Sequence, residues 1–564
     1  MSDTNTSDVV ILGAGLAGLT LAIQLKHAIP DLTVTIIERK SLPYPEATHK
    51  VGESTVEIAA HYFADTLGLR SHLDTEQLRK LGIRLFFSSD NNATIEKRVE
   101  LGSSRYFHVP TYQIDRGRFE NFLIEQVREL GVHLISESKV SNLSVVNSEG
   151  VAAPHPQFLP ANYLASETSE RHIISFDNPH GPSSLSAKWL VDASGRAGLL
   201  KRKLQLQEES PHDSNAVWFR VPHKINIDDW SVDPNWCEGH DGIYSRWFST
   251  NHLTGHGYWV WLIPLSSHYT SIGIVTDPKI HPLTNFRSFT STCAWLEEFE
   301  PKLAEVLRTI DEEPADFLAI KHYAHGCSRV LSPDRWAITG DAGVFLDPLY
   351  SPGSDFIAIQ NTFITDTIVR DLRDQRFIGR AEVYNQLYLQ LSQSVLKSFH
   401  QQYPLFGNPR VMPLKVIWDY TIYWGFLAFL VIQGRICDIT SLKSLEDAVG
   451  EIYALNEAMQ KRLLAQHLTD STPVSPGFVD ISRIPFLLEF NERLTMNLPH
   501  DNLFIDELRH NISTIKRAHQ AIIDVMAGGD DGWQTPEALC EILAQFPASG
   551  PSPLSFESEL TAST

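Results

Sequence analysis

The chain opens with apolar runs separated by a stretch of helical patterning. Residues 9–12 and 34–37 are short apolar runs with β-branched side chains, which is typical of buried parallel strands. Between them, apolar positions from residue 16 to about residue 29 recur with the spacing of a helix. The pattern therefore predicts a strand, a glycine-rich turn, a helix and a second strand that together form a βαβ unit.

The pattern changes further along the chain. Residues 118–130 predict an amphipathic helix that ends near Gly131, and residues 133–135 predict a short strand after it. Residues 215–280 alternate apolar and polar positions and contain many aromatic residues. We therefore expect antiparallel strands here, which form a sheet that faces the substrate.

Segments of different composition divide the chain. Residues 147–187, rich in Pro, Ser, Ala and Asn, are predicted to be a loop insertion before a strand over 189–192. Residues 380–465 show helical patterning without strand signals, and a Ser/Thr/Pro segment near 469–477 is predicted to be a linker. We expect a core over 8–400 with the substrate sheet interleaved at about 215–330, a helical C-terminal region over 401–545, and a disordered tail over 546–564.

One apolar segment, residues 421–432, is similar to part of a membrane helix. Its uncharged run of about a dozen residues is shorter than the ~20 residues that a spanning helix needs. Lys415 and Asp419 lie one helical turn apart just upstream and can pair with each other. We therefore predict a buried helix and no spanning segment. The alternative is an interfacial surface or a surface that binds an apolar substrate.

Composition narrows the class of protein. The 564 residues include 68 acidic and 47 basic side chains, and this formal net charge of −21 argues against nucleic acid as a partner and favours a soluble cytoplasmic protein. Five cysteines lie far apart without a CxxC pair, and the histidines form no HExxH motif. Neither a disulfide framework nor a metal site is therefore expected. The polar N-terminus lacks the pattern of a signal peptide.

The turn between the first predicted strand and helix carries candidate chemistry. It reads GAGLAG, a GxGxxG motif whose glycines permit a tight turn, close approach of a pyrophosphate and close packing of helix and strand. Glu38, at the end of the second strand, is placed to accept hydrogen bonds from ribose hydroxyls. The candidate dinucleotide-binding residues here are Gly13, Ala14, Gly15, Ala17, Gly18, Glu38, Arg39 and, through its backbone beside adenine, Val140.

A second motif, far along the chain, distinguishes between dinucleotides. Residues 338–343 read ITGDAG after a short apolar run, which places Asp341 at the end of a strand. Its carboxylate can bond the ribityl chain of a flavin, whereas an NAD-binding fold needs no such residue so late in the chain. FAD is therefore the expected cofactor. A strand-to-helix turn capped by an aspartate is the simpler alternative.

Four stretches carry a resemblance to a known family. They are VGEST at 51–55, LVDASGR at 190–196, WVWLIP at 259–264 and GDAGVFLDPLYSPG at 340–353. Over roughly residues 8–400 the chain resembles the flavin-dependent halogenases, which share the fold of p-hydroxybenzoate hydroxylase. The resemblance implies an α/β fold with a Rossmann-like FAD/NAD(P)-binding domain, an antiparallel substrate sheet and a helical C-terminal region.

The resemblance also assigns roles to individual residues. Beside the flavin it places Gly52, Glu53, Ser54, Arg116, Asp341 and Gly353. Around the substrate and the halide it places Trp259, Trp261, Pro264, Tyr350, Ser351, Pro352 and Ser354. The family's essential lysine, which holds hypohalous acid, matches Lys80, because residues 77–82 (QLRKLG) follow its FxxKxG pattern except at the first position. A lysine suits that role because its ammonium donates hydrogen bonds and burial readily lowers its pKa.

Two positions depart from the family pattern. Tyr350 stands where tryptophan halogenases have a glutamate, which indicates a phenol- or pyrrole-like substrate. Pro352 replaces a serine or threonine and has no N–H for a halide, so bromide or iodide is expected to be preferred over chloride. The simpler alternatives are core packing for the two tryptophans, an exposed position for Lys80 and a surface role for Arg116.

Together these features predict a flavin-dependent halogenase that acts on an electron-rich aromatic compound with FADH2, oxygen and halide. No second nucleotide motif is apparent, so a separate flavin reductase is expected to supply FADH2. The sequence leaves open whether the small aromatic substrate is free or tethered to a carrier protein. The alternatives are an FAD-dependent monooxygenase or oxidoreductase that uses no halide, which Pro352 favours, and a protein that keeps FAD only for structure.

Overall fold

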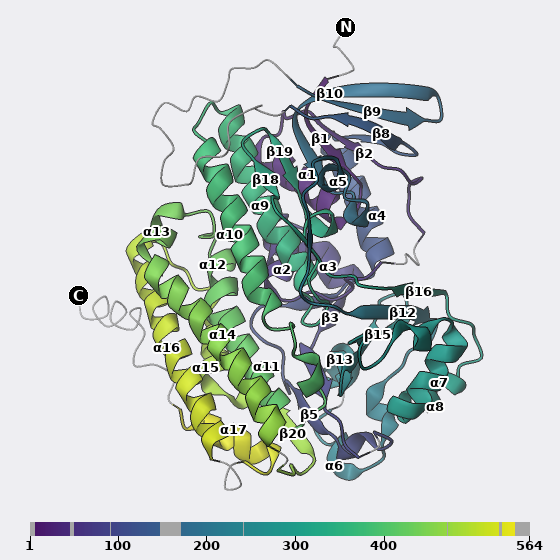
Figure 1. Cartoon of the computed structure of the whole chain (residues 1–564), viewed down its shortest axis with the longest axis vertical. Coiled ribbons are helices and arrows are strands. Elements are labelled where there is room, and N and C mark those ends of the chain that lie inside the picture. Colours follow the sequence, from purple (N-terminus) through teal and green to yellow (C-terminus); the bar gives the residue numbers. More distant parts are fainter. Residues whose placement is uncertain are drawn as a thin grey trace.

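The computed structural model describes the chain over residues 6–45, 50–90, 92–146, 171–240, 242–470, 472–528 and 533–546. The predicted tail from residue 547 onward and residues 147–170 of the predicted loop insertion lie outside these ranges. The described chain has two eight-stranded sheets, two short two-stranded sheets and a helical C-terminal region (Figure 1).

The first large sheet is built around the predicted βαβ unit. β1 (Thr6–Leu12) pairs in parallel with β2 (Val34–Ile37) on one side and with β10 (Gly181–Asp192) on the other. The order of the sheet is β18-β19-β10-β1-β2-β7, and β8 and β9 extend it from β10 as an antiparallel wing. The other strands are β7 (His133–Ile135), β8 (Lys139–Ser144), β9 (His172–Asn178), β18 (Leu331–Ser332) and β19 (Trp336–Ile338).

The N-terminal elements follow the hydrophobic pattern closely, and the predicted loop insertion does not. α1 (Leu16–Ala28) packs against α4 (Arg116–Glu129) and α9 (Pro352–Leu372), and together they cover the parallel strands. The loop prediction is wrong from residue 172 onward, because β9 and the first half of β10 form a hairpin there. Alternate residues of β9 are buried, a period-2 pattern that its polar composition concealed.

The second large sheet has the order β16-β12-β15-β14-β13-β4-β5-β20. Its antiparallel centre comes from the region predicted to form it, as β12 (Asn215–Val221), β15 (Thr270–Thr276), β14 (Tyr258–Pro264) and β13 (Thr250–Gly255). Residues 227–240 and 242–248 contain short helical turns and not strands, which corrects the prediction for those stretches. The outer strands are β4 (Ile83–Phe86), β5 (Val99–Gly102), β16 (Asp316–Ile320) and β20 (Gly477–Asp480).

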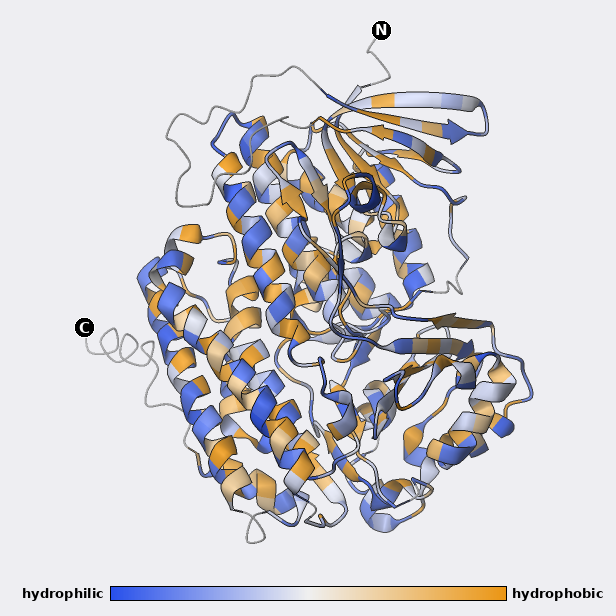
Figure 2. Ribbon diagram, in the orientation of Figure 1, coloured by the Kyte–Doolittle hydropathy of each residue, from blue (hydrophilic) through white to orange (hydrophobic). Residues whose placement is uncertain are grey.

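The C-terminal region is mainly helical, and it also contributes β20. Its longer helices are α10 (Ile378–Leu396), α11 (Val411–Ile422), α14 (Glu446–Thr469), α15 (Pro485–Arg493), α16 (Asp501–Ala527) and α17 (Pro536–Ala544). Both α14 and α16 alternate hydrophilic and hydrophobic residues, whereas the strands around β1 are mainly hydrophobic (Figure 2). The predicted helical region therefore also contains one strand, β20, which corrects the prediction. This strand pairs in parallel with β5.

The apolar segment near residue 421 lies within the protein. Val411–Ile432 forms one continuous helical stretch of 22 residues, long and apolar enough to cross a membrane, but 72% of its apolar window is buried in the described chain. Lys415 donates to Asp419 over 2.9 Å, as its spacing predicted. The burial favours a core helix over a membrane span.

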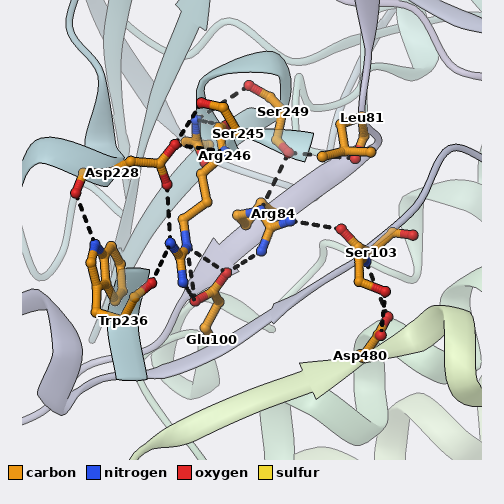
Figure 3. Close-up of polar contacts among 12 residues, drawn as sticks. Leu81, Arg84, Glu100, Ser103, Asp228, Trp236, Ser245, Arg246, Ser249 and Asp480 are labelled. Carbon is orange, nitrogen blue, oxygen red and sulfur yellow. Dashed lines mark hydrogen bonds and ion pairs between the residues drawn. The ribbon is translucent and has the colours of Figure 1, made fainter. Parts of the chain in front are cut away.

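A buried ion-pair network fastens the far edge of the second sheet (Figure 3). Arg84 on β4 and Arg246 both bond Glu100 on β5, and Arg246 also pairs with Asp228 over 3.0 Å. Arg84 donates to the carbonyl of Ser103 over 2.7 Å. Next to it, the Ser104 hydroxyl donates over 2.6 Å to Asp480 on β20. The network therefore joins β4, β5, the helical turns before β13 and the C-terminal strand.

Candidate functional site

A cavity of about 690 Å³ is lined by residues of both large sheets. At one end its walls are the carboxyl ends of the parallel strands β1, β2, β10 and β19, where open α/β sheets bind their ligands. At the other end its wall is one face of the second sheet, with side chains from β12, β13, β14 and β16. One cavity thus connects the dinucleotide motif with the predicted substrate sheet.

The three motif glycines serve two different purposes. A Cβ on Gly18 would lie 2.1 Å from the carbonyl oxygen of Gly13, and a Cβ on Gly13 would lie 2.5 Å from that of Ala193. These two glycines therefore permit close backbone packing. A Cβ on Gly15 would meet nothing within 4 Å, and Gly15 lines the cavity. Gly15 leaves space for a ligand at the N-terminus of α1, where free amides attract phosphate.

Glu38 sits beside this turn at the end of β2. Its carboxylate accepts hydrogen bonds from the backbone N–H groups of Ala14 and Lys40, each over 2.8 Å, and it lines the cavity. Val140, for which the sequence predicts a place beside adenine, also lines the cavity. Basic side chains that line the cavity are Arg39, Lys40, Lys50, Arg116, Lys139 and Arg196. These charges can balance the phosphates of a dinucleotide.

Two carboxyl groups, those of Asp341 and Glu53, line the cavity. Asp341 follows β19 in a turn where Gly340 has a φ of 62°, and burial raises the pKa of its carboxyl group. Burial also raises the pKa of Glu53, although Arg220 bonds it over 2.7 Å. Arg116 donates to the carbonyl of Val51 over 2.7 Å and so holds the VGEST segment against α4. The sequence motifs beside the predicted flavin thus meet in one place.

The residues present suit FAD. The empty space at Gly15, the acidic residue at the end of β2, the surrounding basic side chains and Asp341 form a cradle of dinucleotide type. Gly15 and the basic residues would hold the pyrophosphate, Glu38 a ribose, and Asp341 the ribityl chain.

Two tryptophans form the wall beyond this cradle. Trp259 and Trp261 lie two residues apart on β14, so both face the cavity, with ring centroids 5.7 Å apart. Each indole N–H is fixed, that of Trp259 by Tyr403 over 3.1 Å and that of Trp261 by Ser271 over 3.2 Å. The pair therefore forms an apolar wall of the cavity whose two indole rings are held in place by hydrogen bonds.

Comparisons with known proteins agree with this arrangement. A family model described as tryptophan halogenase matches residues 8–88. The flavin-dependent halogenase chlA of Dictyostelium discoideum is 25% identical over 506 residues, which are 85% of this chain and 79% of that protein. A Pseudomonas fluorescens chlorinase of 1H-pyrrole-2-carbonyl groups on a peptidyl-carrier protein is 25% identical over 83% of this chain and 98% of that protein.

The fold is also that of solved halogenase structures. Halogenase PltM, solved in complex with phloroglucinol and FAD, superposes with a TM-score of 0.56 at 15% identity over 96% of both chains. The chain is thus similar to flavin-dependent halogenases over 83% to 85% of its length. It is an FAD-dependent halogenase.

The predicted lysine of this halogenase does not line the cavity. Lys80 lies on β3 (Leu78–Lys80) and is 2% exposed. Its ammonium donates to the Ser54 hydroxyl and to the Thr55 carbonyl, each over 2.8 Å. Burial lowers the pKa of Lys80 to about 7, against the opposing charges of Glu57 and Asp355. Ser54 lines the cavity in its place.

The turn before α9 has an unusual backbone conformation. Tyr350 and Ser351 both have positive φ values, 67° and 58°, and Pro352 is the first residue of the helix. The Ser351 N–H donates to the Pro348 carbonyl over 3.0 Å. Gly353 and Ser354 line the cavity, and their amides lie in the first turn of α9, where no intrahelical partner exists.

Several predicted site residues lie behind the surface of the main cavity. Pro352 faces an adjoining cavity of about 20 Å³, which it shares with Asp341 and Gly353. Tyr350 and Pro264 are absent from the described residues that line either space. Ala14 and Gly18 likewise act through packing and backbone bonds. The described residues contain no cluster of His, Cys, Asp and Glu that could hold a metal ion.

Sequence reasoning missed a buried polar cluster next to the tryptophan wall. Asp347 accepts hydrogen bonds from Tyr403 over 2.6 Å and Tyr323 over 2.8 Å, and His212 lies 2.7 Å from the same oxygen. Asp347 and Tyr323 line the cavity. These residues come from four separate segments, so only the position of Asp347 inside the GDAGVFLDPLYSPG stretch pointed to the cluster.

Proposed function

We propose that this halogenase acts on a phenol- or pyrrole-like ring, with FADH2 delivered by a separate flavin reductase. The observation that carries the proposal is the continuous cavity from Gly15 to Trp259 and Trp261. Bound FAD supplies the oxygen-dependent oxidation of halide. The tryptophan wall and the apolar face of the second sheet suit a flat aromatic ring.

The halide site that we propose is the first turn of α9. The N–H groups of Gly353 and Ser354 are free to bind an anion, and the helix dipole favours negative charge there. Pro352 has no N–H, and the N–H of Ser351 is already bonded to Pro348. With fewer donors available, we infer that bromide or iodide is used in preference to chloride, which loses more hydration on binding.

Further features support a small aromatic substrate and a location in the cytoplasm. The position of Tyr350 and the similarity to a carrier-protein pyrrole chlorinase support a small ring, either free or on a carrier protein. The five cysteines are all unpaired, which suits the reducing conditions of the cytoplasm.

The decisive experiment combines reconstituted enzyme, photochemically reduced FAD, oxygen and bromide with a panel of phenols and pyrroles. Each ring is offered free and as a carrier-protein thioester. A bromine isotope doublet in the product supports the proposal, and the better form of substrate identifies the route of delivery. Products that contain oxygen and no halogen with any halide would instead support the monooxygenase alternative, which Pro352 favours. Rapid reduction of bound FAD by NADH or NADPH alone would contradict a separate reductase.

A further inference from the structure

The route from Lys80 to the cavity passes through one hydroxyl group. The ammonium of Lys80 is enclosed, and two of its N–H groups are used by Ser54 and Thr55. Ser54 and Thr250 line the cavity, and their hydroxyl oxygens lie 2.9 Å apart. A small molecule in the cavity therefore meets the Ser54 hydroxyl before it can meet the ammonium.

The directions of the hydrogen bonds can be assigned from the number of protons. Thr250 donates its single hydroxyl proton to the side-chain carbonyl of Gln113 over 3.0 Å. The bond between Ser54 and Thr250 must then carry the proton of Ser54. Since Ser54 accepts from Lys80, the chain runs from Lys80 through Ser54 and Thr250 to Gln113. A rotation of the Ser54 hydroxyl turns its proton from Thr250 to an acceptor in the cavity.

Two acidic groups interact with the charge of the ammonium. Glu57 and Asp355 are both buried and attract the charge of Lys80. Asp355 is fixed by the amide of Ala59 over 2.8 Å and the hydroxyl of Tyr423 over 2.7 Å. These charges hold the ammonium in place, and the lowered pKa of Lys80 lets it release a proton near neutral pH.

We propose that Ser54 is the group that contacts hypohalous acid, and that Lys80 acts through it as a proton donor. This inference rests on the proposed function. In the step, the O–X bond of the hypohalous acid breaks and a C–X bond forms on the ring. The departing hydroxide takes the proton of Ser54, and Ser54 takes one from Lys80. The ring then releases its proton to water, and Lys80 takes a proton back from water. The sum of these steps is that hypohalous acid and arene give haloarene and water.

The geometry also distinguishes two roles for the lysine. A haloamine on Lys80 would require its nitrogen to face the oxidant, but Ser54 and Thr55 cover it. A relay needs only the hydrogen bond that is present. General acid catalysis of this kind contributes about 100-fold or more to a rate.

The test compares Ser54→Ala with Ser54→Thr in the FAD-loaded enzyme, with reduced flavin, oxygen and bromide. We expect Ser54→Ala to lower bromoarene per flavin oxidised by about 100-fold. Flavin oxidation is measured in the same samples, so that product is counted per flavin oxidised, and free hypobromous acid should appear in a diketone trap. Ser54→Thr keeps the hydroxyl and should restore most of the product, with the pH profile of the wild type. Ser88→Ala removes a hydroxyl that bonds Thr254 outside the cavity and is the matched control for folding.

A second measurement needs no halogenation. Cyanate carbamylates accessible neutral amines, and peptide mass spectrometry reports each lysine. Lys80 should stay unmodified in the wild type and react in Ser54→Gly, while exposed Lys461 reacts in both. Full bromination by Ser54→Ala, or ready carbamylation of wild-type Lys80, would overturn the relay. If the wild type makes no haloarene, the proposed function fails, and the cyanate result still decides whether Ser54 covers the lysine.

Discussion

The indole N–H of Trp259 donates to the hydroxyl of Tyr403 over 3.1 Å. Tyr403 in turn donates to Asp347, so the orientation of the tryptophan wall depends on a buried carboxylate. We expect Tyr403→Phe to leave both Trp259 and Asp347 short of a partner and to reduce the free energy of unfolding by about 1–3 kcal/mol. Thermal unfolding and tryptophan fluorescence measure these effects.

The same variant should also uncouple oxidation from halogenation. With a less fixed Trp259, we expect less haloarene per flavin oxidised. Tyr323→Phe is the matched control, because Tyr323 donates to Asp347 without bonding Trp259. Equal coupling in Tyr403→Phe and the wild type would show that the hydrogen bond to Trp259 has no effect on the reaction.

Two glycines of the first motif should respond differently to substitution. Gly15→Trp should abolish FAD binding and leave the protein folded, since a side chain there points into the open cavity. Gly18→Ala should destabilise the protein itself, because its Cβ would lie 2.1 Å from the Gly13 carbonyl. Flavin fluorescence titration and thermal unfolding separate the two effects. A Gly15→Trp protein that binds FAD as well as the wild type would contradict the proposed pyrophosphate site.

Pro352→Ser tests the halide site. The substitution restores an N–H at the start of α9, and a hydrogen bond to a charged group contributes about 1.5–3 kcal/mol. We expect the share of chlorinated product to rise at equal chloride and bromide, because the more strongly hydrated chloride gains more from an added donor. Both products are counted by mass spectrometry. An unchanged ratio would mean that the first-turn amides do not select the halide.

Lys80→Met should change how stability depends on pH. The lowered pKa means that the folded protein loses the Lys80 proton at about pH 7, whereas the unfolded chain keeps it to about pH 10.5. The cost of burying the charge is therefore full below pH 7 and disappears as the pH rises through this window. The stability of Lys80→Met relative to the wild type should fall between about pH 7 and pH 10.

Denaturant unfolding at several pH values above neutrality measures this difference. Burial raises the pKa of Asp355 to about 7, so Asp355 titrates below the chosen window and acts in the opposite sense. Parallel stability curves for the variant and the wild type would contradict a lowered pKa for Lys80.

Glu100→Gln tests the network of Figure 3. The change leaves the buried Arg84 and Arg246 without their shared carboxylate, which should cost about 3–5 kcal/mol of unfolding free energy. Glu297→Gln removes an exposed partner of Arg308 and should cost about 0–1 kcal/mol. Denaturant midpoints of the two variants give the comparison. Equal midpoints would show that the buried pairs add no stability to the sheet.

Local patterns predicted the local parts of the fold. β2 and β7 begin and end where the apolar runs do, and α1 follows its helical spacing. The pairing of β20 with β5 had no local signal, because it joins segments far apart and β20 has only four residues. The hairpin of β9 and β10 was hidden by its polar composition.

The candidate site was likewise predicted only where local sequence determines it. Glycine and acidic motifs located the FAD cradle, because each works through backbone close to it in sequence. The position of Lys80 behind Ser54, and the meeting of His212 with Asp347, depend on tertiary packing. Those relationships could not be read from spacing along the chain.

The pairing of β20 with β5 has a consequence for synthesis of the protein. Paired residues Val99 and Gly477 are about 380 positions apart, so β5 leaves the ribosome roughly 20 to 75 seconds before its partner strand. During that interval the nascent sheet has an open edge, which is a template for association with other chains. Glu100 lies on that strand, and both of its arginine partners, Arg84 and Arg246, are synthesised before β20. The ion pairs of Glu100 can therefore form early, whereas the edge of β5 stays open until β20 has been made.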